Sequence, residues 1–184
     1  LRRQRQMCIR DSAGTLVAVI YFFRTDIALM LKAIFTNEAS IKKNKSLALQ
    51  LIIATIPIVL AGLIFKDLIG QRLFSVSSIA LSNILFAIVL LFAFLKNKSD
   101  KTIYQVTIYS ALFIGIVQCF ALIPGASRSG TAITAALLIG LSLRDASKFA
   151  FMLGIPTILG ALILLLFETQ SLDASFNFTV LIIG

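Results

Sequence analysis

The sequence predicts an all-α, polytopic membrane protein, a helical bundle that contains a re-entrant helical hairpin. Of 184 residues, 59% are hydrophobic and 14% are charged, a balance that a water-soluble domain of this size does not tolerate on its surface. Several uncharged runs approach the roughly 20 residues that a helix needs to cross a bilayer. The basic residues lie mostly between these runs, so membrane topology explains the net charge of +9 and no nucleic-acid partner is expected.

The two ends of the chain differ from its middle. Residues 1–12, LRRQRQMCIRDS, are polar and lack the apolar core of a signal peptide. An apolar run follows directly at Ala13. We therefore expect a foreign basic leader over 1–12 and a membrane domain fragment over 13–184, truncated at both ends. The last apolar residues, 176–184, are expected to be a partial span.

Loop charge orients the expected spans. Lysines are concentrated in the segments 36–46 and 96–102, which the positive-inside rule assigns to the cytoplasmic side, whereas 66–75 is assigned to the outer side. Arg24 and Asp26 close the first apolar run, where we expect them to pair locally. The complete spans are expected at 13–35, 47–65, 79–95 and 149–167.

The segment 104–143 poses a topological problem, because a lysine-rich loop precedes it and a basic loop, 143–148, follows it. A single span cannot begin and end on the same side. We expect a re-entrant hairpin in which a helix from about Tyr104 to Ile123 enters and 131–143 returns. The return limb is too short to span. Two tandem spans with an outer polar loop are the alternative.

Cysteine and histidine counts exclude several kinds of chemistry. The chain has two cysteines and no histidine. Two cysteines support neither a disulfide framework nor a metal cluster. The lack of histidine excludes a Ser-His-Asp triad, a phosphohistidine intermediate and an imidazole-ligated metal within this chain.

The tip of the expected hairpin, IPGASRSGTAIT, has the chemistry of a tight turn before a helix. Pro124 ends the incoming helix, while Gly125 and Gly130 permit backbone conformations that bulkier residues resist. Ser129 or Thr131 is the natural N-cap of the following helix. Because the first amides of a helix lack intrahelical partners, such a start attracts an anion.

Arg128 lies in this tip between two serines. Its planar guanidinium suits bidentate contact with phosphate oxygens, and Ser127 and Ser129 add hydroxyls. An arginine at bilayer depth costs at least about 2.5–3.5 kcal/mol, and no carboxylate lies within fifteen residues on either side. An anionic ligand is therefore the expected partner. The alternative is an arginine that extends to a lipid headgroup beside serines that only cap a helix.

The string PGASRSG at 124–130 resembles the signature of the bacterial undecaprenyl-diphosphatase family, membrane enzymes associated with bacitracin resistance. GTLVAVIYFFRTDI, at 14–27, and LLIGLSLRDASKFAFMLGIPTILGA, at 137–161, resemble further segments of that family. The resemblance implies an inverted-repeat fold with two re-entrant hairpins, multi-pass in the bacterial inner (plasma) membrane. It also implies hydrolysis of undecaprenyl diphosphate to undecaprenyl phosphate and phosphate, which recycles the lipid carrier of peptidoglycan synthesis.

The resemblance also implies site residues. It assigns catalytic roles to Ser127, Arg128 and Ser129, and substrate binding to Gly125, Gly130 and Thr131. Arg128 is expected to bind the diphosphate. The family usually has threonine two places after the final glycine, where this chain has Ala132. Thr131, one step earlier, is expected to supply that hydroxyl instead.

A divalent metal, Mg or Ca, is implied by the resemblance as a cofactor. The family binds it through two glutamates four residues apart, which should lie upstream of Ala13, and this sequence contains no such pair. We assign no metal ligand. Because phosphoryl transfer without a metal lacks its main charge stabiliser, we expect that the chain does not hydrolyse the substrate alone.

Two other classes of function remain open. A transporter of polyprenyl phosphate would use the same broken helix as an anion site near the bilayer midplane. An inert bundle would use the tip only as a turn. The expected partners are a polyprenyl diphosphate lipid and the bilayer, and a homodimer is one alternative for the oligomeric state.

Overall fold

The computed structural model of the chain describes residues 14–35, 42–65 and 75–170. The expected leader, the expected partial span at 176–184 and most of the expected outer loop at 66–75 lie outside the described residues.

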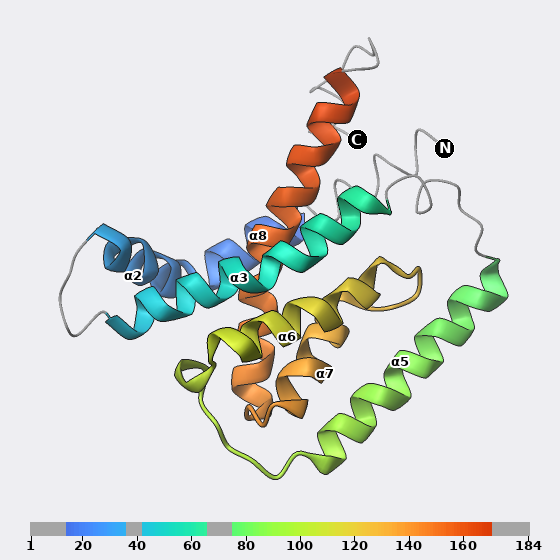
Figure 1. Cartoon of the computed structure of the whole chain (residues 1–184), viewed down its shortest axis with the longest axis horizontal. Coiled ribbons are helices and arrows are strands. Elements are labelled where there is room, and N and C mark those ends of the chain that lie inside the picture. The colour runs from blue at the N-terminus through green and yellow to red at the C-terminus, as the bar shows by residue number, and fades with distance from the viewer. Residues whose placement is uncertain (1–13, 36–41, 66–74, 171–184) are drawn as a thin grey trace.

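The described chain is helical, as predicted. A helix at Gly14–Phe22 comes first, and Figure 1 shows most of the elements that follow. They are α2 (Arg24–Phe35), α3 (Lys42–Ile64), α5 (Val76–Lys96), η2 (Ile103–Gln105), α6 (Ile108–Gln118), η3 (Cys119–Leu122), α7 (Arg128–Leu138) and α8 (Leu143–Gln170).

Two of these helices have the length and apolarity of membrane spans. They are α3 and α5, which contain the expected spans 47–65 (to Ile64) and 79–95. The expected span 149–167 lies within α8. The expected span at 13–35 is instead two helices that meet at a bend of 73° around Phe23. Phe23 is buried, so the bend is packed into the core.

The local pair expected between Arg24 and Asp26 is wrong. The Arg24 guanidinium lies 4.5 Å from the centre of the Tyr21 ring and donates to the Tyr21 carbonyl oxygen. Asp26 forms an ion pair with Lys148 of α8, with 2.7 Å between Oδ1 and Nζ. The bend turns Asp26 toward a helix that is distant in sequence, which a reading of neighbouring residues does not reveal.

The segment expected to be a re-entrant hairpin forms a helical hairpin of α6, η3 and α7. Its first limb begins at Ile108 rather than at Tyr104, because the Thr107 side chain accepts a hydrogen bond from the Ser110 amide and caps the helix there. The second limb, α7, has 11 residues over 128–138, whereas 131–143 was expected. A helix of 11 residues is about 16 Å long, which is short for a single span across a hydrocarbon core of about 30 Å. The re-entrant insertion and the two tandem spans both stay predictions.

The base of the hairpin, formed by Asn97, Lys101 and residues 139–142, is joined by backbone hydrogen bonds. Lys101 donates to the Gly140 carbonyl oxygen at 3.2 Å and accepts from the Ser142 amide at 3.0 Å. Asn97 Nδ2 donates to the Leu141 carbonyl oxygen at 2.6 Å. The two ends of the segment therefore lie side by side, as the loop charges predicted.

The basic segment 143–148 is the start of α8, not the loop that was expected. The Ser142 hydroxyl accepts a hydrogen bond from the Asp145 amide at 3.2 Å, which satisfies one of the first amides of this helix. Lys148 consequently lies on a helix face, where its position is fixed by α8.

Close packing holds the hairpin inside the bundle. In Figure 1, α6 and α7 lie side by side between α5 and the crossing helices α3 and α8. A Cβ added at Gly115 would collide with the backbone of Ala54, so α6 and α3 are in backbone contact. Small residues allow this approach between membrane helices.

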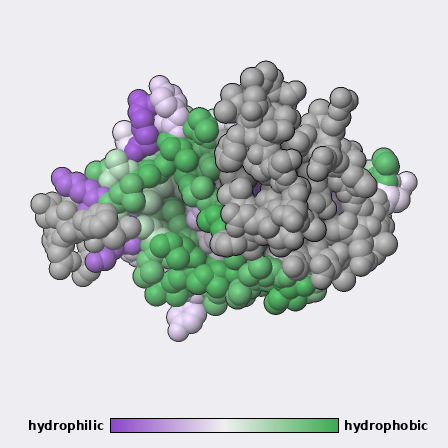
Figure 2. All heavy atoms as spheres, turned by 90° about the horizontal axis from the view of Figure 1, so that it is seen from above, coloured by the Kyte–Doolittle hydropathy of each residue, from purple (hydrophilic) through white to green (hydrophobic). Residues whose placement is uncertain are grey.

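The surface matches a membrane protein. Large apolar side chains are exposed on most helices, and on α5 only Ala93 is buried. Figure 2 shows apolar residues across much of the described part of one face, with hydrophilic residues gathered toward one end. Lipid is the solvent that such a surface requires, and the chain is a membrane protein.

Candidate anion-binding site at the hairpin tip

Gly125 sets the shape of the tip. Its φ is +98°, a conformation that favours glycine. A Cβ at this position would also collide with the Ile79 carbonyl oxygen of α5. The tip therefore depends on glycine twice, once for its turn and once for its contact with α5.

Ser127 is the N-cap of α7, so the expectation of Ser129 or Thr131 was wrong. Its hydroxyl accepts a hydrogen bond from the Gly130 amide at 3.2 Å, and its carbonyl oxygen accepts from the Thr131 amide at 2.9 Å. The extended backbone of Ser127, with φ −70° and ψ 125°, turns into the helix at the next residue. Arg128 is consequently the first residue of α7.

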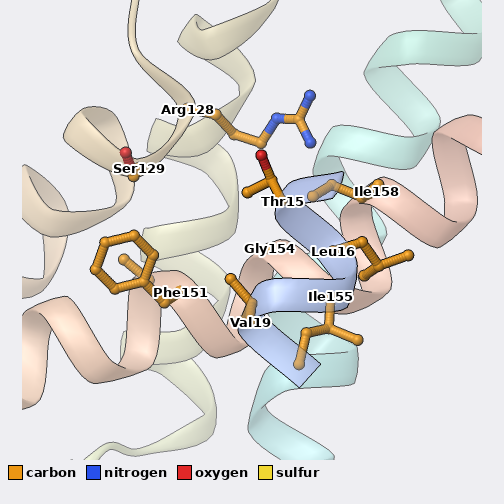
Figure 3. Close-up of a pocket in the computed structure, with 10 residues that line it drawn as sticks. Thr15, Leu16, Val19, Arg128, Ser129, Phe151, Gly154, Ile155 and Ile158 are labelled. Carbon is orange, nitrogen blue, oxygen red and sulfur yellow. The ribbon is translucent and has the colours of Figure 1, made fainter. Parts of the chain in front are cut away.

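Arg128 and Ser129 line a pocket of about 280 Å³. In Figure 3, the Arg128 side chain extends past Thr15, while Leu16, Val19, Ile155 and Ile158 form an apolar part of the lining. The full lining is Thr15, Leu16, Val19, Arg128, Ser129, Ala150, Phe151, Gly154, Ile155 and Ile158. A mostly apolar pocket with a few polar groups at one place is typical of ligand sites.

The Arg128 guanidinium has no acidic partner among the described residues. Their one ion pair joins Lys148 to Asp26. Arg128 is accessible, and its positive charge faces a pocket whose described lining contains no carboxylate. The backbone amides of Arg128 and Ser129, as the first residues of α7, also have no intrahelical acceptor. A positive charge and free backbone donors thus belong to the same helix start beside the pocket.

The other expected site residues support the tip from outside the pocket. The Ser127 hydroxyl is 3.3 Å from that of Ser129 and is engaged in capping. Thr131 is 2% exposed, and its hydroxyl donates to the Arg128 carbonyl oxygen at 2.9 Å. A Cβ on Gly130 would lie 3.1 Å from that of Ser127, so Gly130 leaves room for the cap.

Most of the apolar lining was missed by the sequence reasoning. Thr15, Leu16 and Val19 come from a run that was read only as a span, and Ala150 to Ile158 from another. One sequence signal could have indicated these lining residues. Both segments belong to the stretches that carry the family resemblance, 14–27 and 137–161. Apolar residues in a membrane helix do not by themselves reveal whether they face lipid or a pocket.

The tip lies far from the base of the hairpin along α5. Gly125 contacts Ile79, in the first turn of α5, whereas the base is bonded through Asn97, the C-cap of α5. At 1.5 Å per residue, these positions are about 27 Å apart along the helix. The hairpin therefore runs along most of the length of α5.

The described pocket does not fit a divalent metal. Its lining supplies a guanidinium and hydroxyls but no carboxylate. Among the described residues, no group of three side chains of the ligating types could hold a metal ion. Oxygen ligands, mainly carboxylates, are what Mg²⁺ and Ca²⁺ require.

Comparisons with known proteins agree with the sequence resemblance. A family model described as bacitracin resistance protein BacA matches residues 6–184. The undecaprenyl-diphosphatase of Saccharophagus degradans is 45% identical over 148 residues, which is 79% of this chain and 55% of the relative. Undecaprenyl-diphosphatase 1 of Pseudoalteromonas translucida is 41% identical over 148 residues, with the same shares. The chain thus spans about half the length of these curated relatives.

Proposed function

The chain belongs to the bacitracin resistance protein BacA family, and from this premise we propose that it forms the diphosphate-binding part of a membrane phosphatase. The reaction is hydrolysis of undecaprenyl diphosphate to undecaprenyl phosphate and phosphate, which returns the lipid carrier to peptidoglycan synthesis. The names of both relatives support this activity, and neither supports the transporter alternative.

One observation carries the proposal. Arg128, which has no acidic partner among the described residues, stands at the start of α7 and at the edge of an apolar pocket. A lipid diphosphate matches both properties, because its head is anionic and the adjoining chain is apolar. The pocket, at about 280 Å³, suits the head and the first part of the chain rather than a whole long lipid.

The roles of the residues follow from their chemistry. The Arg128 guanidinium binds phosphate oxygens in a bidentate manner, and the Ser129 hydroxyl donates a further hydrogen bond. The amides at the start of α7 add positive potential toward the same oxygens. Ser127, Gly130 and Thr131 hold the helix start in place. The divalent metal stays a prediction, and no step is assigned to it.

The site opens toward the outer face of the bacterial inner (plasma) membrane, in a multi-pass protein. The lysine-rich loops put the base of the hairpin on the cytoplasmic side. The tip is about 27 Å away along α5, which brings Arg128 near the opposite surface. A hairpin that enters from inside can therefore serve a site that opens outside. A homodimer also stays a prediction.

Binding measurements on the chain in lipid nanodiscs test the proposal. We expect farnesyl diphosphate, a short prenyl diphosphate, to bind. Arg128→Ala should weaken its affinity at least about tenfold. Arg128→Lys should weaken it less, since lysine keeps the positive charge but lacks the several N–H donors of the planar guanidinium. Arg144→Ala is the matched control, because this exposed arginine lies at the hairpin base. Equal affinities for Arg128→Ala and the unaltered chain would contradict the proposal.

A further inference from the structure

One ion pair joins α8, which forms one apolar wall of the pocket, to α2, which directly follows the helix that forms the other wall. Lys148 Nζ lies 2.7 Å from Asp26 Oδ1, with the side chains 28% and 27% exposed. The two residues are 122 positions apart in the chain. Among the described residues no other acidic and basic side chains form an ion pair.

The ion pair lies beside the pocket but outside its lining. Asp26 belongs to the first turn of α2, just past the bend at Phe23 that ends the helix carrying Leu16 and Val19. Lys148 precedes Ala150, the first pocket residue of α8, by two positions. The ion pair therefore joins the chain next to one wall to the chain next to the other.

The lipid environment of the two wall helices gives the ion pair its importance. In lipid, apolar side chains gain little from contacting each other rather than the acyl chains. Side chains that face the pocket from opposite walls also do not touch across it, because such contacts would fill the pocket. They therefore do not set the distance between the walls. An ion pair with a defined length adds a specific connection to the apolar packing of the core.

Neighbouring charges do not compete for these two side chains. Arg24 is held at the Tyr21 ring, and the nearest acidic residue on α8, Asp145, accepts a hydrogen bond from the Ser142 hydroxyl at 3.4 Å. Asp26 and Lys148 are thus each other's only ion-pair partner within the described chain.

We propose that the Asp26–Lys148 ion pair sets the separation of the two pocket walls, which makes Asp26 and Lys148 positioning residues for the prenyl part of a ligand bound at Arg128. This inference rests on the proposed function for the identity of the ligand. The part of the inference that concerns the separation of the walls rests on the structure alone.

The first test measures the wall separation directly, without a ligand. Spin labels are placed at Val17 and Leu159, which are 67% and 43% exposed on the two wall helices and do not line the pocket. Both cysteines of the chain are changed to serine, and the distances between the two labels are measured by pulsed electron paramagnetic resonance in nanodiscs. We expect Asp26→Lys and Lys148→Asp each to shift or broaden the distance distribution, and the double charge swap to restore it.

The second test measures which part of a ligand depends on the ion pair. The single charge reversals should weaken farnesyl diphosphate binding by about three- to tenfold. Binding of inorganic pyrophosphate, which has no prenyl chain, should stay unchanged, because it engages only the Arg128 end. The swapped double variant, and the conservative Asp26→Glu and Lys148→Arg, should retain most of the farnesyl diphosphate affinity.

Controls separate this inference from the proposed function. Lys32→Asp reverses an exposed charge on α2 that has no ion-pair partner among the described residues, so it should change neither readout. If Arg128→Ala weakens both diphosphates while the single reversals leave distances and affinities unchanged, only the ion-pair inference falls. If Arg128→Ala leaves the affinities for farnesyl diphosphate and pyrophosphate unchanged, the proposed function is contradicted. The label-to-label distances then still test whether the ion pair sets the wall separation.

The swapped double variant keeps the test decisive even where a single reversal fails to fold. It carries the same two charges in exchanged places, so a restored distance distribution and affinity support the pair. A swapped variant that folds but keeps an altered distance or a weakened farnesyl diphosphate affinity overturns the inference.

Discussion

Gly125 illustrates how one residue determines where the Arg128 guanidinium lies. Its positive φ turns the chain three residues before Arg128, and its missing side chain lets the tip touch the Ile79 carbonyl oxygen. The position of Arg128 in the bundle therefore depends on a contact between two backbones. A side chain at the tip would push the loop away from α5.

Replacing Gly125 by alanine should destabilise the protein by about 2 kcal/mol or more, because alanine is strained at this φ and its Cβ meets the backbone of α5. An apparent melting temperature about 4–8 °C lower is expected in nanodiscs. Gly154→Ala is the control, since nothing lies within 4 Å of a Cβ there. Equal melting temperatures for the two variants would show that the tip does not depend on this contact.

At the residue scale, the sequence indicated Arg128, Ser129 and the turn glycines, because their types are costly or unusual in an apolar stretch. It did not indicate the N-cap correctly. Ser127, Ser129 and Thr131 can all accept a hydrogen bond from an amide two or three positions ahead, so residue type alone does not choose among them. The backbone conformation of Ser127 decides the position.

Among the elements, the hairpin depends on close contact between α6 and α3. Gly115 brings the backbone of α6 against that of Ala54, and the Gln50 side chain of α3 donates to the Val106 carbonyl oxygen just before α6. These contacts hold the entering limb in the bundle. The returning limb, α7, lies against α5, α6 and α8 and contains several buried small residues.

Gly115→Ala should separate α3 from α6 and lower stability by about 1–3 kcal/mol, a typical cost of overpacking. Gly62→Ala is the matched control, because it is also a glycine in an apolar helix but its Cβ would meet nothing within 4 Å. Thermal unfolding in nanodiscs is the measurement. A melting temperature for Gly115→Ala at or above that of Gly62→Ala would contradict the packing described here.

Element types were predicted more reliably than element bounds. Length and apolarity indicated α3, α5 and α8, since a bilayer imposes both on a spanning helix. Loop charge indicated the hairpin, because its two ends carry the same topological signal. The bend at Phe23 escaped prediction because it is packed into the core by distant parts of the chain. The helical start of α8 at Leu143 also escaped prediction, although Ser142 caps it locally.

In the whole molecule, a candidate anion site adjoins an apolar pocket inside a membrane bundle. The wall helices come from opposite ends of the described chain, and the tip that carries Arg128 comes between them in sequence. Neither wall helix was predicted to line a site, because a pocket is a property of the assembled fold. The resemblance to a family was the one sequence signal that covered all three parts.

The 184-residue chain should release no phosphate from a polyprenyl diphosphate, even though it should bind one. The sequence contains no pair of glutamates four residues apart, and the described pocket supplies no carboxylate. Without such ligands the reaction lacks its main means of stabilising charge. Phosphate release by the purified chain, above the level of an Arg128→Ala control, would contradict this prediction.

The most direct measurement for the central claim is an experimental structure of the chain in lipid with a non-hydrolysable prenyl diphosphate analogue. We predict diphosphate oxygens within about 3 Å of the Arg128 guanidinium and the Ser129 hydroxyl, with the prenyl chain against Leu16 and Ile155. An analogue bound elsewhere, with the Arg128 side chain turned out to a lipid headgroup, would contradict the account.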